Sequence, residues 1–121
     1  MKIYTSYFSM LRHIPEDIIP VAISVYSPPG YKGLSMTTLA PSKDILFEYK
    51  KNPDEEKYTQ AYMQQLNMLT PEAVYNILHK LTCGKDCVLL CYEKTGSFCH
   101  RNLVAQWMSN AGYDVVEWIK T

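Results

Sequence analysis

Two hydrophobic patterns alternate along this chain. Residues 2–7, 18–26, 86–92 and 113–119 are short runs rich in apolar, aromatic and β-branched side chains, and runs of this length predict β-strands. In residues 86–92, six of the seven side chains are apolar, aromatic or cysteine. Such a run is typical of a strand covered on both faces, as in a parallel sheet.

Between these runs, apolar residues recur at the three- and four-residue spacing of amphipathic helices. Four helix starts are predicted at Ser42, Asp54, Thr70 and Ser97, because such side chains accept hydrogen bonds from free backbone amides. Gly112 is expected to end the last helix. The side chains predicted to face the core are Ile45, Leu46 and Tyr49; Tyr58, Ala61, Tyr62, Gln65, Leu66 and Leu69; Val74, Ile77, Leu78 and Leu81; and Leu103, Val104, Trp107, Met108 and Ala111.

Strands that alternate with helices favour the α/β class. We therefore expect residues 1–121 to form a single three-layer, Rossmann-like domain, with a small, mostly parallel sheet of about four strands flanked by helices. Residues 9–13 are too few for a full crossover helix, so a short helical turn or an irregular loop is expected there. An antiparallel pairing of the first two strands stays open.

Composition narrows the classes of partner. The 121 residues are 47% hydrophobic and 20% charged, which suffices for a real core. Twelve basic and twelve acidic residues cancel, so no global field recruits nucleic acid or an anionic membrane, and a nucleic-acid contact is not favoured. No apolar run approaches the roughly 20 residues of a membrane span, which predicts a cytoplasmic protein with reduced thiols. Ten tyrosines and two tryptophans mark either a core or a homo-oligomer interface.

The junction between residues 86–92 and the helix that follows concentrates the reactive side chains Cys91, Glu93, Cys99, His100 and Arg101. Ligands of α/β proteins collect at the carboxyl ends of strands, where helix N-termini favour anions. Arg101 in a first helical turn opposes the helix dipole, and an anionic ligand would remove that conflict. The alternative is an ion pair between Glu93 and Arg101 that only holds the loop.

Cys99 is the candidate nucleophile. A helix N-terminus and neighbouring cationic side chains lower the pKa of a thiol, and Glu93 and His100 could then act as acid–base groups. Adjacent helical residues diverge by about 100°, so the sequence does not establish a contact between His100 and the Cys99 sulfur.

A metal site is not predicted, and neither is a cofactor. Cys87 and Cys91 on one strand would stand roughly 13 Å apart at about 3.3 Å per residue, too far to share one zinc ion. Only Cys91, Cys99, His100 and Glu93 could meet. No Cys-x-x-Cys pair is present, so Cys83 and Cys87 are interpreted as loop or core thiols.

Four further residues are candidate ligand contacts. Tyr31 could stack on a base and Lys32 could contact a phosphate from a loop rich in proline and glycine, although such loops are also ordinary turns. Ser9 and Arg12 would reach the same edge as Arg101 if the first and third strands run parallel. Otherwise Arg12 is a surface charge.

Several motifs resemble one family. Thr5-Ser6-Tyr7-Phe8, Pro29-Gly30-Tyr31-Lys32-Gly33, Leu39-Ala40-Pro41, Leu90-Cys91-Tyr92-Glu93-Lys94 and Cys99-His100-Arg101 are similar to the domain of unknown function family 488 over nearly the whole chain. The resemblance implies a small α/β protein found largely in bacteria and their phages. It adds weight to the Cys-x-Glu and Cys-His-Arg residues as one shared site, and it names no substrate.

Three functions follow as hypotheses. The first is binding of, or action on, a small anionic, nucleotide-like or phosphorylated ligand at the strand-to-helix site. In it, Arg101 and Lys32 hold phosphate, Glu93 accepts a hydrogen bond and Tyr31 stacks. The second is a thiol-dependent enzyme with Cys99 as nucleophile. The third is a nucleic-acid or protein-interaction module that uses Tyr31, Lys32, Arg12 and Lys94.

Overall fold

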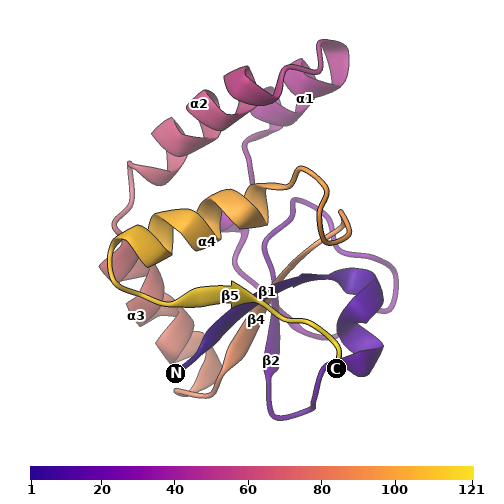
Figure 1. The fold of residues 1–121 in the computed structure, drawn as a ribbon, viewed down its shortest axis with the longest axis vertical. Helices are drawn as coiled ribbons and strands as arrows, with labels where there is room; N and C mark the ends of the chain where they lie inside the picture. The colour runs from indigo at the N-terminus through magenta and orange to yellow at the C-terminus, as the bar shows by residue number, and fades with distance from the viewer.

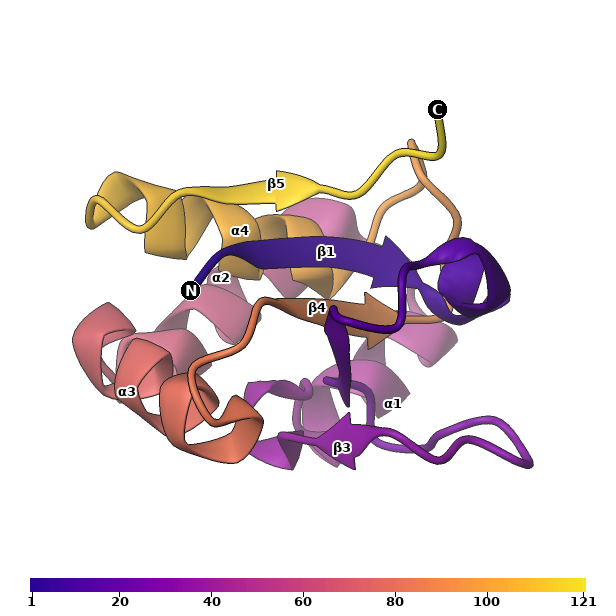
Figure 2. The ribbon, with the colours of Figure 1, turned by 90° about the horizontal axis from the view of Figure 1, so that it is seen from below.

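A five-stranded, wholly parallel sheet forms the centre of the protein. The computed structural model describes residues 1–121. The strands are β1 (Ile3–Tyr7), β2 (Ile19–Ala22), β3 (Leu34–Ser35), β4 (Cys87–Cys91) and β5 (Val115–Glu117), in the order β3-β2-β4-β1-β5. Figure 2 shows the strands side by side, with most of the helices behind them. The predicted α/β, Rossmann-like fold class is confirmed.

The four helices begin where the sequence places most of their caps. They are α1 (Lys43–Lys51), α2 (Glu55–Leu66), α3 (Pro71–Thr82) and α4 (His100–Asn110). The side chains of Ser42, Asp54 and Thr70 each accept a backbone N–H three residues later, which satisfies an otherwise unpaired donor. The predicted start of the last helix was wrong. Its N-cap is Cys99 rather than Ser97, and no side chain caps it.

β4 lies at the middle of the sheet, and all five of its residues are buried. It pairs in parallel with both β1 and β2, so the antiparallel pairing left open for the first two strands does not occur. The short 3₁₀ helix η1 (Phe8–His13) connects β1 to β2. It is the short helical turn that was one of the two expectations for residues 9–13. The two-residue β3 was not predicted, because so short a strand leaves no hydrophobic pattern.

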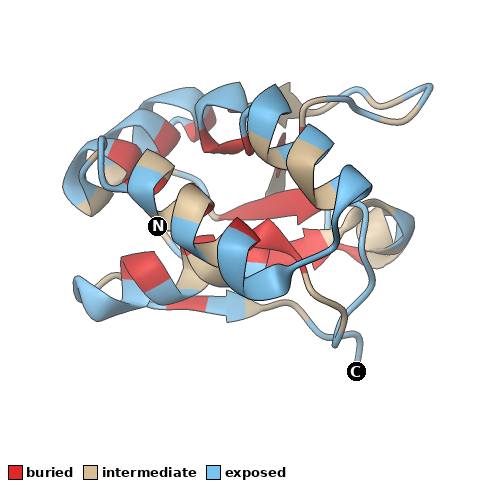
Figure 3. Cartoon of the chain, turned by 90° about the horizontal axis from the view of Figure 1, so that it is seen from above, coloured by how far each residue is buried: buried red, intermediate tan, exposed pale blue.

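The two faces of the sheet are covered unequally. The larger cluster holds 16 buried residues, to which α2, α3 and α4 contribute, and partly buried side chains of α1 pack against it. The cluster of four on the other face is packed by η1 and the C-terminal segment. Figures 1 and 3 show the α-helices gathered on one side, with their outer surfaces exposed. Right-handed crossovers explain this, since the connection from β1 to β2 runs across the sheet in the opposite direction to those from β3 to β4 and from β4 to β5.

Four side chains predicted to face the core are exposed, and Ala111 is one of them. Leu46 is 37% exposed, Ile77 43% and Leu81 40%. In α3 only the row Val74, Leu78 and Thr82 is buried, a single line of residues spaced four apart. The helix lies near the margin of the helical layer (Figure 2), so the core covers a narrower stripe of it than the sequence pattern suggested. No helix combines the length and apolar character needed to cross a membrane.

Candidate functional site

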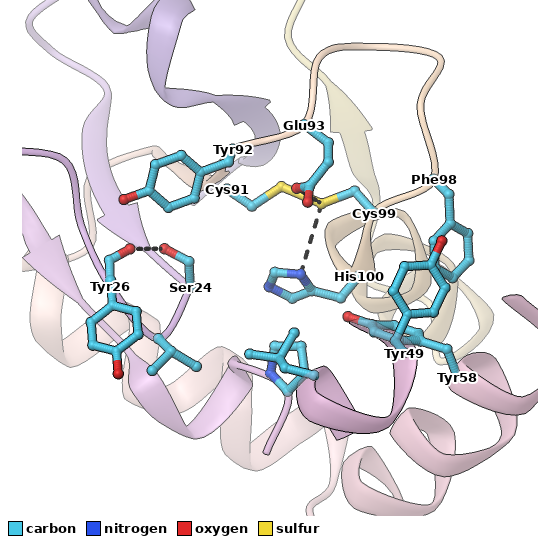
Figure 4. Close-up of a pocket in the computed structure, with 13 residues that line it drawn as sticks. Ser24, Tyr26, Tyr49, Tyr58, Cys91, Tyr92, Glu93, Phe98, Cys99 and His100 are labelled. Atoms are coloured by element: carbon cyan, nitrogen blue, oxygen red, sulfur yellow. Dashed lines mark hydrogen bonds between the residues drawn. A yellow bond between two sulfur atoms is a disulfide. The ribbon is translucent and has the colours of Figure 1, made fainter. Parts of the chain in front are cut away.

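A pocket of about 200 Å³ opens at the carboxyl edge of the sheet, where β4 leads through residues 92–98 into α4. Figure 4 shows aromatic rings on both sides of it and a group of sulfur, imidazole and carboxylate side chains between them. The aromatic lining residues are Tyr26, Tyr49, Tyr58, Tyr92 and Phe98. They come from four separate parts of the chain, so the pocket exists only after folding.

The structure brings four of the predicted site residues together. Cys91, Glu93, Cys99 and His100 all line the pocket. The Cys99 Sγ lies 3.2 Å from Glu93 Oε2 and 3.7 Å from His100 Nδ1, a contact between neighbouring residues that helical geometry alone does not require. The Cys91 and Cys99 sulfurs are joined as a disulfide in this structure.

His100 is held in one orientation. Its Nε2 lies 2.7 Å from the carbonyl oxygen of Ile23, at the end of β2. Burial lowers the pKa of His100 to about 4. The hydrogen bond to the Ile23 carbonyl raises this pKa, and the charge of Arg101 lowers it further. The ring is therefore neutral near pH 7. Because the carbonyl can only accept, Nε2 carries the proton and Nδ1 presents a lone pair toward Cys99.

Arg101 lies behind the pocket and does not line it. The residue is 0% exposed. Its Nη2 and Nε donate to Glu117 at 2.8 and 3.1 Å, and its Nη1 donates to Cys91 Sγ at 2.9 Å and to the Glu93 carbonyl. The expected alternative of a Glu93–Arg101 ion pair is thus replaced by an ion pair with Glu117. The anion that offsets Arg101 at the helix start is a side chain of the protein itself.

Glu117, at the end of β5, is the residue that the sequence analysis missed. It also accepts hydrogen bonds from the hydroxyls of Thr5 and Thr95, at 2.7 and 2.6 Å. Burial raises its pKa, but the hydrogen bonds from Arg101, Thr95 and Thr5 outweigh that effect and lower it. A carboxylate at the end of an otherwise apolar strand was the available signal. We name Arg101, Glu117, Thr5 and Thr95 the arginine clamp.

The other predicted ligand residues lie outside the pocket. The Tyr31 hydroxyl donates to the Leu34 carbonyl at 2.6 Å, and its ring packs edge-on against Phe8. Tyr31 and Lys32 line a different surface hollow. Ser9 and Arg12 are exposed on η1, and neither lines the pocket. Residues 9, 12, 31 and 32 therefore do not join the Cys-His-Glu group in this structure.

The remaining thiols differ from Cys91 and Cys99. Cys87 is fully buried. Burial and the charge of Asp86 raise its pKa to about 12, and the amino terminus of the chain opposes this rise. Cys83 is exposed at the end of α3. Cys91 Sγ, Cys99 Sγ and His100 Nδ1, in contrast, all lie within 4.8 Å of one another. These three atoms are the ones that a metal ion could share.

Comparison with known protein families identifies a family for most of the chain. Residues 11–112 match the family model described as the active DUF488-N3 subclade. That segment contains the pocket residues and Arg101 but stops before Glu117. Searches of the curated proteins and of the solved structures found no match.

Proposed function

Since the chain belongs to the DUF488 family, we propose that its pocket binds a small molecule with a nucleobase-like ring and acts on it. The observation that carries the proposal is the composition of the pocket, in which aromatic walls enclose a cysteine, a neutral histidine and a carboxylate. The matched model is described as active, which favours turnover over binding alone. We place this chemistry in the cytoplasm, where thiols stay reduced.

The aromatic walls suit a flat ring. Tyr49, Tyr58 and Phe98 pack against one another with ring centroids 5.0–5.7 Å apart, so one wall is already fixed. Tyr26 and Tyr92 are 71% and 50% exposed and stand at the other side, where they could cover a bound ring. Stacking on such side chains contributes about 1–3 kcal/mol per base and tolerates different bases.

Polar groups then orient the ring and its substituents. The Glu93 carboxylate can accept hydrogen bonds from ring or amino N–H groups. No side chain caps α4, so the first two amides of this 11-residue helix, those of His100 and Arg101, are available to an anionic substituent such as phosphate. Arg101 acts in this proposal by holding residues 91 and 93 in place, rather than by contacting phosphate.

Ligand binding tests the proposal. Nucleosides and nucleotides are expected to raise the melting temperature of the protein, because they bind only the folded state. Glu93→Gln should weaken that binding roughly 10- to 100-fold, the value of one hydrogen bond to a charged group. Thermal shift and calorimetry over a panel of nucleobases, nucleosides, nucleotides and inorganic phosphate provide the measurement.

Glu56→Gln is the matched control, because Glu56 is an exposed carboxylate on α2 outside the pocket. It should leave the affinity unchanged. Absence of any shift across the panel, or an equal loss in both variants, would contradict the proposed ligand class. A shift with phosphate that ring-bearing compounds do not exceed would contradict the role of the aromatic walls.

A second candidate is a thiol-dependent enzyme with Cys99 as nucleophile. Its support is the proximity of two proton acceptors, Glu93 and the Nδ1 atom of His100, to the Cys99 sulfur. After reduction and metal chelation, iodoacetamide should modify Cys99 before the exposed Cys83, and Cys87 should not react. Peptide mass mapping over time measures this order. Faster modification of Cys83 would count against Cys99 as an activated thiol.

The third hypothesis, a nucleic-acid or protein-interaction module, stays a prediction. Its proposed residues are Arg12, Tyr31, Lys32 and Lys94. None of them lines the pocket, so the geometry described above adds nothing in its favour.

A further inference from the structure

We propose that, once the disulfide is reduced, Cys91, Cys99 and His100 bind a zinc ion whose fourth coordination position opens into the pocket. This inference deepens the proposed function and rests on it, since it supplies the reacting group for a ligand held by the aromatic walls. It also departs from the sequence analysis, which predicted no metal.

The spacing of the three donor atoms suits one ion. Zinc bonds of about 2.3 Å to sulfur and about 2.0–2.1 Å to nitrogen, arranged tetrahedrally, hold neighbouring donor atoms about 3.5–3.8 Å apart. Cys99 Sγ and His100 Nδ1 are 3.7 Å apart, and all three donors lie within 4.8 Å. The two sulfurs are bonded to each other here and must move apart on reduction to reach the same spacing. Two thiolates and one imidazole form a donor set that zinc prefers.

The backbone favours a shared ion over a direct bond. Cys91 is the last residue of β4 and Cys99 immediately precedes α4. Their Cα atoms are 7.6 Å apart. Disulfides usually span Cα separations of about 4.4–6.8 Å. A zinc ion between the two sulfurs accommodates the wider separation, so we infer that the reduced pair is the metal-binding form and the disulfide its oxidised counterpart.

The surrounding contacts are those that support a metal site. Metal-binding histidines usually donate their second ring N–H to a carbonyl or carboxylate, as His100 does toward Ile23. Arg101 donates to the Cys91 sulfur at 2.9 Å, which stabilises a thiolate there. The charge of Arg101 is balanced by Glu117, and the two thiolates balance the charge of Zn²⁺.

An open fourth coordination position distinguishes a reactive zinc site from a structural one. All three ligands line the pocket, so a water molecule could complete the coordination. Glu93 Oε2, only 3.2 Å from Cys99 Sγ, is placed to take one proton from that water. This transfer leaves hydroxide on the zinc and a neutral carboxylic acid at Glu93. The site then fits hydrolytic chemistry, and Cys99 acts as a ligand instead of a nucleophile.

Metal content of the whole protein tests this inference. The protein is reduced with a phosphine, loaded with one equivalent of Zn²⁺ or Co²⁺ and freed of excess metal. We expect one ion per chain and, with Co²⁺, a thiolate-to-cobalt charge-transfer band. Cys91→Ser, Cys99→Ser and His100→Ala should each weaken zinc affinity at least tenfold, whereas Cys83→Ser and Cys87→Ser should keep it.

Glu93→Gln tests whether Glu93 acts as a base or as a ligand of the zinc ion. It should retain the full zinc content, because Glu93 is placed as a base and not as a ligand. Loss of zinc in this variant would make Glu93 the fourth ligand and overturn the open site. Failure of the reduced protein to hold zinc, or equal retention by the Cys91 and Cys99 variants, would overturn the metal site itself. Metal content is independent of the ligand-induced thermal shift, so either proposal can fail without the other.

Discussion

Replacing Arg101 with methionine is expected to lower the free energy of unfolding by about 3–5 kcal/mol, the usual cost of removing one partner from a buried ion pair. Arg101 is 0% exposed. Its loss removes the donor to the Cys91 sulfur and the Glu93 carbonyl and leaves Glu117 with only the Thr5 and Thr95 hydroxyls. Urea denaturation followed by circular dichroism measures the change. Because the clamp also fixes the start of residues 92–98, ligand affinity should fall with it.

Arg12→Met is the control for the Arg101 substitution. Arg12 is an exposed arginine on η1, so its replacement should change stability by less than about 0.5 kcal/mol. Arg101→Lys should recover only part of the loss, since an ammonium group cannot reproduce the two-pronged contact with Glu117. Equal stabilities for the Arg101 and Arg12 variants would refute the clamp.

The clamp also has a signature in the dependence of stability on pH. The pKa of Glu117 is lowered in the folded protein, so its carboxylate stays ionised at pH values where the unfolded chain takes up a proton. The stabilisation is therefore fully present above about pH 4.5 and is lost as the pH falls through the lowered pKa. Glu117→Gln should flatten this part of the stability profile.

Leu78→Ala is expected to lower the free energy of unfolding by about 2–5 kcal/mol, whereas Leu81→Ala should cost less than about 1 kcal/mol. Both are the same substitution on the same helix, α3. Leu78 is 0% exposed and belongs to the large core, but Leu81 is 40% exposed. The first substitution therefore leaves a cavity, and the second removes a side chain that water already contacts.

Chemical denaturation of the two alanine variants, with unchanged slopes against urea, gives the comparison. Similar losses for both would mean that α3 buries the broader face that its sequence pattern suggested. A larger loss for Leu81→Ala would overturn the packing of this helix altogether.

Local signals explain what could be predicted from the sequence. The helix starts at Ser42, Asp54 and Thr70 depend on hydrogen bonds to residues three positions ahead, so a short window of sequence contains all the information. The buried character of β4 was likewise visible as a continuous apolar run. The meeting of Cys91, Glu93, Cys99 and His100 followed from one strand, one loop and one helix that are consecutive in the chain.

Tertiary contacts explain what could not be predicted. Arg101 pairs with Glu117 only because β5 lies beside β1, with Thr5 paired to Glu117 in the register, and no local pattern specifies that neighbourhood. Tyr58 has the helical spacing of a core residue, yet it also lines the pocket. Ile77 and Leu81 were wrongly assigned to the core because periodicity gives the direction of a helix face but not the width that its neighbours cover.

The unequal covering of the sheet has a consequence for how the protein opens. Local opening needs least free energy where few apolar contacts must be broken, and the face beneath η1 holds the cluster of only four buried residues. Amide hydrogens of η1 and of the C-terminal segment should therefore exchange with solvent through small openings that leave the helical face intact. In the pocket, Tyr92 packs edge-on against Phe8 of η1, so such openings should free this ring while the wall of Tyr49, Tyr58 and Phe98 stays in place.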